Sequence, residues 1–300
     1  MASVVLLAGG TGGAKLARGL LDELGPELVV IANTGDDVEI YGAHVSPDPD
    51  LITFWLADQI DERGWGLAED TFHAMDQLRA LGEQIWFNLG DRDLAIGLHR
   101  AQRLAAGGRL THSIEDLRRA FGVPARVLVP TDAPLRTWIR SGGNWHAFQE
   151  FMIRVKGPLE DVEYRAERPP EPTAEALEAI SEASAIIVGP SNPVLSIDPI
   201  LAVLGDAIRE AAAPVVAVSP LVRGAVLKGP TADCLTWAGQ TLDSDGIADH
   251  YGDLLSGLVA DERTDLVPTL ETDVELGDAE SRRRVAREVL EFASALAHAA

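Results

Sequence analysis

The 300-residue sequence has one cysteine, Cys234, and no apolar run as long as the ~18–20 residues of a membrane-spanning helix. A single cysteine excludes an intramolecular disulfide framework and a cysteine-rich metal site. The opening residues, MASVVLLAGG, lack the basic segment of a signal peptide and read directly as a strand followed by a glycine turn. We therefore expect a cytoplasmic protein without a membrane partner.

Basic residues are also scarce. The sequence has 25 Lys plus Arg against 47 Asp plus Glu, a formal charge of −22, and only three of the 25 are lysines. Because no basic excess can neutralise phosphates, a nucleic-acid partner is not expected. A halophilic surface and GC-rich codon usage explain this acidity equally well. An anionic substrate would need a local cation, a helix N-terminus or a metal ion.

Apolar runs over residues 3–8 and 27–33 predict buried parallel strands, with a helix between them. The other strands are expected at 84–88, 126–130, 146–155, 183–189 and 214–219. Helices are expected at about 50–60, 68–81, 92–106, 113–121, 173–182, 198–211, 246–256 and 277–298. This alternation predicts a doubly wound, mostly parallel α/β sheet. We interpret residues 1–300 as one domain, with a helix-rich lobe at about 50–122 over the carboxyl edge of the sheet.

A glycine turn, GGTGGAK at 9–15, joins the first strand to the first helix. Glycines allow a tight turn and close approach of a ligand, and the exposed helix N-terminal amides suit a phosphate. The spacing fits neither the dinucleotide fingerprint nor a Walker A loop. We predict a phosphate or nucleotide site here, the alternative being a tight turn without a ligand. The candidate ligands are Gly9, Gly10, Thr11, Gly12, Gly13 and Lys15.

Two acidic clusters follow the second strand. Asn33 leads into Asp36 and Asp37, and Asp48 and Asp50 lie in the segment SPDPD at 46–50. Acidic residues at this edge of a sheet commonly hold a ribose hydroxyl or a metal ion, and Mg²⁺ prefers carboxylates together with substrate phosphates. As an alternative, Asp48 or Asp50 caps the following helix. We expect a Mg²⁺ site from Asp37, Asp48 and Asp50.

Three later segments carry further candidates. Arg92, in LGDRD, would grip a phosphate or carboxylate, or else form a local salt-bridged cap. The loop GPSNP at 189–193 follows an apolar strand and offers polar groups at the same edge, without the surroundings of a serine-hydrolase elbow. Lys228 lies in a turn that would face this edge, or else is a solvated lysine. The remaining candidate ligands of the nucleotide are Asn33, Ser191, Asn192, Pro193 and Ser219.

The sequence resembles the 2-phospho-L-lactate transferase family of coenzyme F-420 biosynthesis, which includes a phosphoenolpyruvate-using bacterial branch. The resemblance covers about residues 4–265. It is carried by LAGGTGGAK at 7–15, NTGDD at 33–37, SPDPD at 46–50, GWG at 64–66, LGDRDLA at 89–95, HAFQE at 146–150, GPSNP at 189–193 and SP at 219–220. The glycine turn GGAK is closer to bacterial members than to the Gly-Thr-Pro-Lys of archaeal ones, so the donor acid stays open.

The resemblance implies a Rossmann-like fold with an added lobe and a Mg²⁺-dependent activity. A phospho-acid group, 2-phospho-L-lactate or phosphoenolpyruvate, would pass from lactyl- or enolpyruvyl-diphosphoguanosine to the primary hydroxyl of the deazaflavin Fo, releasing GMP. Small-molecule partners and a homodimer are implied as well.

By the same resemblance, Asp37 and Asp50 are the strongest matches to the metal and Fo ligands. Arg92 would contact Fo or the transferred phosphate. The glycine turn and residues 191–193 would hold the guanosine diphosphate.

The main alternative is a non-enzymatic regulator that shares the glycine loop and binds a nucleotide sugar. Such regulators carry a segment like VxDDGGSSG after the second strand. This sequence has NTGDDVEIYG there, with no paired Gly and no Ser pair. A dinucleotide-dependent oxidoreductase is disfavoured by the failed fingerprint.

Overall fold

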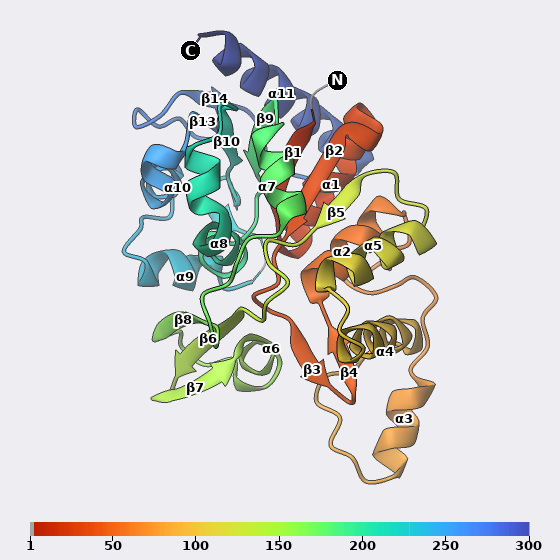
Figure 1. The fold of residues 1–300 in the computed structure, drawn as a ribbon. Helices are drawn as coiled ribbons and strands as arrows, with labels where there is room; N and C mark the ends of the chain where they lie inside the picture. The colour runs from red at the N-terminus through yellow and green to blue at the C-terminus, as the bar shows by residue number, and fades with distance from the viewer. Residues whose placement is uncertain (1–2, 228, 300) are drawn as a thin grey trace.

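The computed structural model describes residues 3–227 and 229–299. Its centre is a seven-stranded parallel sheet (Figure 1). In sheet order the strands are β14 (Thr269–Glu271), β13 (Gly257–Ala260), β10 (Val215–Val218), β9 (Ala185–Val188), β1 (Val4–Ala8), β2 (Leu28–Ala32) and β5 (Arg126–Leu128).

The chain enters this sheet in the middle. From β1 it moves outward through β2 to β5, and it then returns to the other side of β1 and continues through β9, β10, β13 and β14. Val4 pairs with Leu28 on one side and with Ala185 on the other. The strand order therefore reverses between β1 and β9, and ligand sites of open α/β sheets form at the carboxyl ends beside such a reversal.

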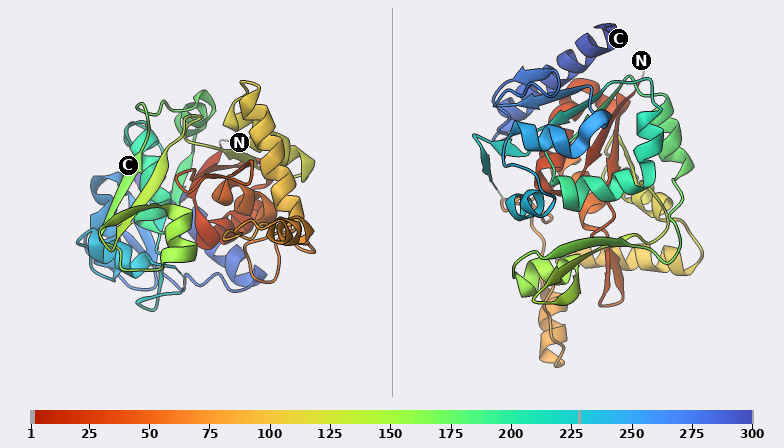
Figure 2. Two further views of the ribbon diagram at one scale, coloured as in Figure 1. Left: turned by 90° about the horizontal axis from the view of Figure 1, so that it is seen from below. Right: turned by 90° about the vertical axis from the view of Figure 1, so that its left-hand side faces the viewer.

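Helices cover both faces of the sheet (Figures 1 and 2). Alternate residues of β1 explain this, since Leu6 packs into one apolar cluster and Leu7 into the other. One face carries α1 (Gly10–Leu24), α2 (Pro47–Leu56), α5 (Leu110–Ala120) and α11 (Ala279–Ala299). The other carries α7 (Ala174–Ser181), α8 (Asp198–Arg209) and α10 (Ser244–Tyr251). The predicted doubly wound Rossmann-like α/β fold is confirmed.

The helix-rich block predicted at about 50–122 contains α2 to α5. Two of these helices, α2 and α5, pack on the central sheet itself. The other two, α3 (His73–Ala80) and α4 (Asp91–Ala105), extend below it beside the hairpin of β3 (Val38–Ile40) and β4 (Ala43–Val45). A small core that includes Val45 and Met75 joins these parts.

A second extension is an antiparallel sheet in the order β7 (Asn144–Ala147), β6 (Arg136–Ser141) and β8 (Asp161–Arg165). Side chains of β6 alternate between buried and half-buried, as expected for a sheet with one covered face. The short helices α6 (Phe148–Glu150) and η2 (Phe151–Val155) follow β7 and cover that face. In Figure 1 and in the right-hand view of Figure 2 this sheet lies below the carboxyl edge of the central sheet.

The remaining elements are short. They are η1 (Gly25–Glu27), η3 (Pro193–Ile197), β11 (Leu221–Val222), β12 (Ala225–Val226), α9 (Thr231–Trp237) and η4 (Gly252–Leu254). Within the part of the chain that the structure describes, no helix is long and apolar enough to cross a membrane. Lys228 lies outside the described residues.

Two predicted strands are wrong. Residues 84–88 have no regular structure, and their apolar side chains instead cover the small core beneath β3 and β4. The strand predicted at 146–155 ends at Ala147, because Phe148 and Phe151, three residues apart, turn helically into the core under β6. The polar, proline-rich segment 156–173 contains the edge strand β8.

Candidate active site

Three strand ends meet beside the strand reversal. Gly9 follows β1, Asn33 follows β2 and Ser191 follows β9 by three residues. The Gly9 N–H donates to Ser191 Oγ at 3.2 Å, and the Asn33 N–H donates to the carbonyl of Ala8 at 2.9 Å. The fold thus brings together the glycine turn, NTGDD and GPSNP, which the sequence separates by up to about 180 residues.

Asp48 closes this arrangement from the first turn of α2. One carboxylate oxygen accepts the Gly10 N–H at 2.6 Å, and the other accepts Nδ2 of Asn33 at 2.9 Å. Burial raises the pKa of Asp48 to about 6; the hydrogen bonds from Gly10 and Asn33 oppose this rise and the charge of Asp37 adds to it. The carboxylate therefore ties the start of α1 to the end of β2.

Asp36 and Asp37 add two more buried carboxyl groups. Burial, followed by the nearby charges of Asp48 and Asp37, raises the pKa of Asp36 well above its ordinary range. Its Oδ2 accepts Nε2 of Gln149 at 3.2 Å, a contact from the second extension. Because the carboxyls of Asp36, Asp37 and Asp48 repel one another, a bound cation would be favourable here.

Some buried oxygens in this region have no hydrogen-bond partner among residues 3–227 and 229–299: Oδ1 of Asp37, Oγ1 of Thr34 and Oγ of Ser46. Buried polar atoms in folded proteins are nearly always paired, so each such oxygen calls for an explanation. An unpartnered carboxylate oxygen is a suitable ligand for a hard cation such as Mg²⁺.

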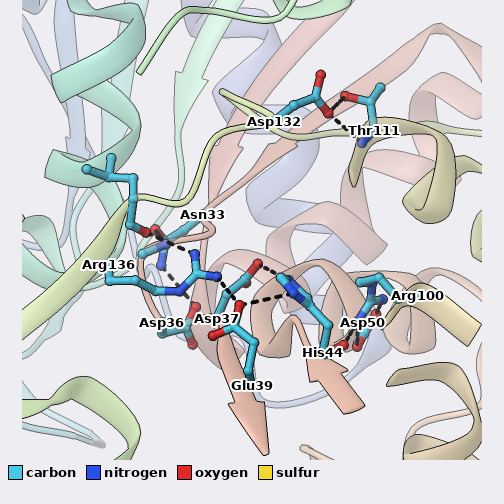
Figure 3. Close-up of polar contacts among 12 residues, drawn as sticks. Asn33, Asp36, Asp37, Glu39, His44, Asp50, Arg100, Thr111, Asp132 and Arg136 are labelled. Carbon is cyan, nitrogen blue, oxygen red and sulfur yellow. Dashed lines mark hydrogen bonds and ion pairs between the residues drawn. The ribbon is translucent and has the colours of Figure 1, made fainter. Parts of the chain in front are cut away.

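The other oxygen of Asp37 begins a chain of contacts that Figure 3 shows. Asp37 Oδ2 lies 3.1 Å from Nε2 of His44, and Nδ1 of His44 lies 3.2 Å from Oε1 of Glu39. Nη2 of Arg136 donates to the same Glu39 oxygen at 2.7 Å. Burial lowers the pKa of His44, but its hydrogen bonds to the carboxylates of Asp37 and Glu39 raise it by more, so the net direction is upward.

Asp50, which the sequence predicts as a ligand of Mg²⁺, lies in a buried ion pair. Both of its oxygens accept from the guanidinium of Arg100 in α4, and Arg100 is 1% exposed. Burial raises the pKa of Asp50, and the guanidinium opposes that rise. The same Arg100 donates to the backbone carbonyl of His44 at 2.9 Å. Asp50 therefore joins two helices.

Close packing explains the glycines of the turn. A Cβ on Gly9 would lie 2.4 Å from an oxygen of Asp48, and one on Gly12 would lie 2.1 Å from the carbonyl oxygen of Pro190. A Cβ on Gly13 would lie 2.6 Å from Ser191 Oγ. Only glycine allows α1 to start this close to the loop after β9.

The other predicted nucleotide ligands surround this junction. Thr11 and Lys15 are half-buried on α1. Asn192 caps η3 by accepting the Leu195 N–H at 2.9 Å, and Pro193 is buried at its start. Ser219 is buried after β10, one strand further along, where its Oγ accepts the Leu221 N–H.

Arg92 is exposed and lies on the first turn of α4. Its guanidinium donates to the carbonyl of Ala68 and to Oε1 of Gln59, each at 3.0 Å. The side chain thus supports the loop between α2 and α3. That loop also carries Trp65, which is 68% exposed and so is not core, whereas Phe54 is buried as a core residue.

A cavity of about 580 Å³ opens beside His44. It lies between the β3–β4 hairpin, α4 and the loop that leads to β6. Its polar lining includes Glu39, His44, Asp132 and Arg136, and its apolar lining includes Leu104 and Leu110. Asp132 is fixed by Thr111, whose N–H and hydroxyl both donate to Oδ1 (Figure 3). The volume of the cavity falls in the range of small-molecule sites.

Among the described residues, no group of three or more His, Cys, Asp or Glu side chains is arranged to hold a metal ion by itself. Mg²⁺ usually needs only one or two carboxylates together with substrate phosphates. Asp37, through its unpartnered oxygen, and Asp48 fit that pattern.

Sequence reasoning missed several residues of this region: Glu39, His44, Arg100, Arg136 and Gln149. Gln149 belongs to the HAFQE motif, so a signal for it existed. No sequence pattern indicated His44, because no metal-ligand spacing surrounds it. Arg100 lies 50 residues from its partner Asp50.

Comparison with known proteins identifies the family of this chain. Residues 4–288 match the family model described as 2-phospho-L-lactate transferase CofD. The chain is 36% identical to a phosphoenolpyruvate transferase of Kitasatospora aureofaciens, covering 98% of this chain and 99% of that one. It is 35% identical to a 2-phospho-L-lactate transferase of Methanosarcina mazei, covering 87% of each.

A solved structure of a UPF0052-family protein from Bacillus halodurans shares the fold, with a TM-score of 0.62 at 16% identity over 96% of this chain and 98% of that chain. This likeness supports the architecture alone. The family match and the curated relatives extend over the strand ends, the acidic segments and the cavity, and the chain belongs to the 2-phospho-L-lactate transferase family.

Proposed function

We propose that this chain transfers a phospho-acid group, 2-phospho-L-lactate or phosphoenolpyruvate, from its guanosine-diphosphate-activated form to the hydroxyl of the deazaflavin Fo. The new bond joins the Fo oxygen to the phosphorus of the acid, the bond from that phosphorus to GMP breaks, and the hydroxyl proton is released. The observation that carries the proposal is the buried Asp37 carboxylate, with one unpartnered oxygen, at the strand reversal of a transferase-family fold.

The donor's diphosphate would lie at the start of α1. The helix N-terminus supplies a partial positive charge, and the glycine turn allows close approach. Ser191 and Asn192 border the turn from the neighbouring strand. A local site of this kind is needed because the net charge of −22 repels an anionic donor.

Asp37 and Asp48 are the residues that would hold Mg²⁺. Bound there, the ion would neutralise charge on the donor's phosphate oxygens. Asp50 would keep its ion pair with Arg100 and fix the first turn of α2, from which Asp48 extends.

The acceptor ring would occupy the cavity beside His44. Its volume of about 580 Å³ and its mixture of apolar and polar walls suit a tricyclic ring with polar edges. A hydroxyl on a side chain attached to that ring would then reach the carboxylates of Asp37 and Asp48.

Relatives named for each of the two acids match this chain at similar identity, so both donors need to be tested. Purified protein, Fo and Mg²⁺ would be mixed with lactyl- or enolpyruvyl-diphosphoguanosine in separate reactions, with mass detection of the Fo phosphodiester. We expect product with at least one donor, loss of product with EDTA and recovery with excess Mg²⁺. No product with either donor, and no change in Fo absorbance on mixing, would overturn the proposal in favour of the nucleotide-sugar-binding regulator.

A further inference from the structure

His44 is buried and has a carboxylate at hydrogen-bond distance from each ring nitrogen. The β3–β4 hairpin produces this arrangement. Tyr41 and Gly42, with φ of 52° and 78°, form its two-residue turn, and positive φ at both positions is typical of a type I′ turn. That turn sets the register in which Glu39 pairs with His44 across the two strands.

The backbone of His44 is fixed as well. Nη1 of Arg100 donates to its carbonyl oxygen at 2.9 Å. Helix α4 approaches so closely at Gly97 that a Cβ there would lie 3.0 Å from Cβ of Ala43 and 3.3 Å from the His44 carbonyl oxygen. The imidazole is therefore held from its main chain and from both ring nitrogens.

Only one oxygen of Asp37 takes part in these contacts. His44 holds Oδ2, and Oδ1 is buried without a hydrogen-bond partner in the part of the chain that the structure describes. A carboxylate fixed through one oxygen presents the other in a single direction, as outer contacts of metal ligands commonly do.

We propose that His44 is a positioning residue for Asp37. It orients Asp37 so that Oδ1 faces the start of α1, where the donor's phosphates would bind, and Glu39 and Arg136 hold His44 in turn. This inference rests on the proposed function, in which Asp37 binds the metal ion. His44, Glu39 and Arg136 also line the cavity of about 580 Å³, so the same residues would separate an acceptor bound there from Asp37.

The test uses the full chain and Mn²⁺ alone, with free Mn²⁺ followed by electron paramagnetic resonance. Relative to wild type, His44→Leu should raise the Kd for Mn²⁺ by roughly 10-fold or more, as expected when an outer contact of a ligand is lost. His44→Gln keeps a donor near the position of Nε2 and should restore most of the affinity. The matched control is His99→Leu, since His99 is exposed on α4 and should leave the Kd unchanged.

A purely structural role would lower the stability of His44→Leu and leave the Mn²⁺ affinity of its folded form unchanged, which would overturn the inference. If His44→Leu does not fold, Glu39→Leu carries the test, because Glu39 is 64% exposed at its side chain. We expect a severalfold higher Kd there, and an unchanged Kd would overturn the inference.

The variant Asp37→Asn tests the proposed metal site separately from the positioning role of His44. If Asp37→Asn loses Mn²⁺ binding while His44→Leu retains it, the positioning role alone is wrong. If Asp37→Asn binds Mn²⁺ as wild type does, the proposed metal site and the role of His44 are both wrong.

Discussion

The guanidinium of Arg100 donates to both carboxylate oxygens of Asp50, and this buried pair joins α4 to α2. Asp50 lies two residues after Asp48, on the same first turn of α2. The pair therefore sets the position of the turn from which Asp48 reaches the N-terminus of α1. A carboxylate that the sequence marks as a metal ligand has this structural partner instead of a free oxygen.

Removing one partner of this pair should destabilise the protein strongly. Arg100→Met leaves the Asp50 carboxylate buried without its counter-charge, and we expect a loss of about 3–5 kcal/mol in the free energy of unfolding. The double variant Asp50→Leu with Arg100→Met should lose less, because neither charge is then left unpaired. Urea unfolding of the three proteins measures this, and a loss below about 1 kcal/mol for Arg100→Met would contradict the assignment.

The sequence predicts the centre of the fold well, because β1, β2, β9 and β10 are short apolar runs followed by glycine or polar residues. Continuous apolar runs of this kind are typical of strands buried on both faces. The strands of the extensions carry weaker signals. In β6, Trp138 and Arg140 alternate with buried residues, and the β3–β4 hairpin has only three residues in each strand. Their pairing depends on tertiary contacts.

The candidate site divides in the same way. Gly9, Asn33 and Ser191 could be predicted because each follows a predicted parallel strand, and such strand ends share one edge of a sheet. The residues that contact the acidic side chains could not be predicted from the sequence. The contact of Asp50 with Arg100 and that of Glu39 with Arg136 span 50 and 97 residues, and neither leaves a local sequence pattern.

Stability should fall as the pH rises through the titration of Asp48. Its pKa is raised from an ordinary 3.8 to about 6, so between these values the folded state keeps a proton that the unfolded state has released. Below pH 3.8 the contribution is fully present, and above pH 6 it is lost. A rise of about two pKa units corresponds to about 3 kcal/mol.

The measurement for Asp48 is urea unfolding at several pH values between 3.5 and 7, for wild type and Asp48→Asn. The variant cannot titrate at this position, so the difference in unfolding free energy between the two proteins should change by about 3 kcal/mol across the range. Parallel curves for wild type and variant would contradict the raised pKa.

Gly12→Ala should disrupt the glycine turn. The new Cβ would meet the carbonyl oxygen of Pro190 at 2.1 Å, and neither backbone segment can move freely. We expect a loss of about 1–3 kcal/mol in unfolding free energy, together with weaker binding of GDP. Gly205→Ala in α8 is the control, because its Cβ would meet the flexible end of Arg209 at 3.4 Å and Cβ of Leu201 at an ordinary 3.9 Å. It should stabilise the helix by about 0.5–1 kcal/mol. Equal stabilities of the two variants would contradict this description of the turn.

The most direct test of the account compares initial rates of Fo phosphodiester formation for wild type, Asp37→Asn and Asp206→Asn, with Mg²⁺ and the better donor. Asp206 is fully exposed on α8 and serves as the matched control. We predict a rate lower by roughly 100-fold or more for Asp37→Asn, because the unpartnered carboxylate is lost, and an unchanged rate for Asp206→Asn. Turnover of folded Asp37→Asn at the wild-type rate would contradict the central claim that transfer takes place beside the carboxylates of Asp37 and Asp48.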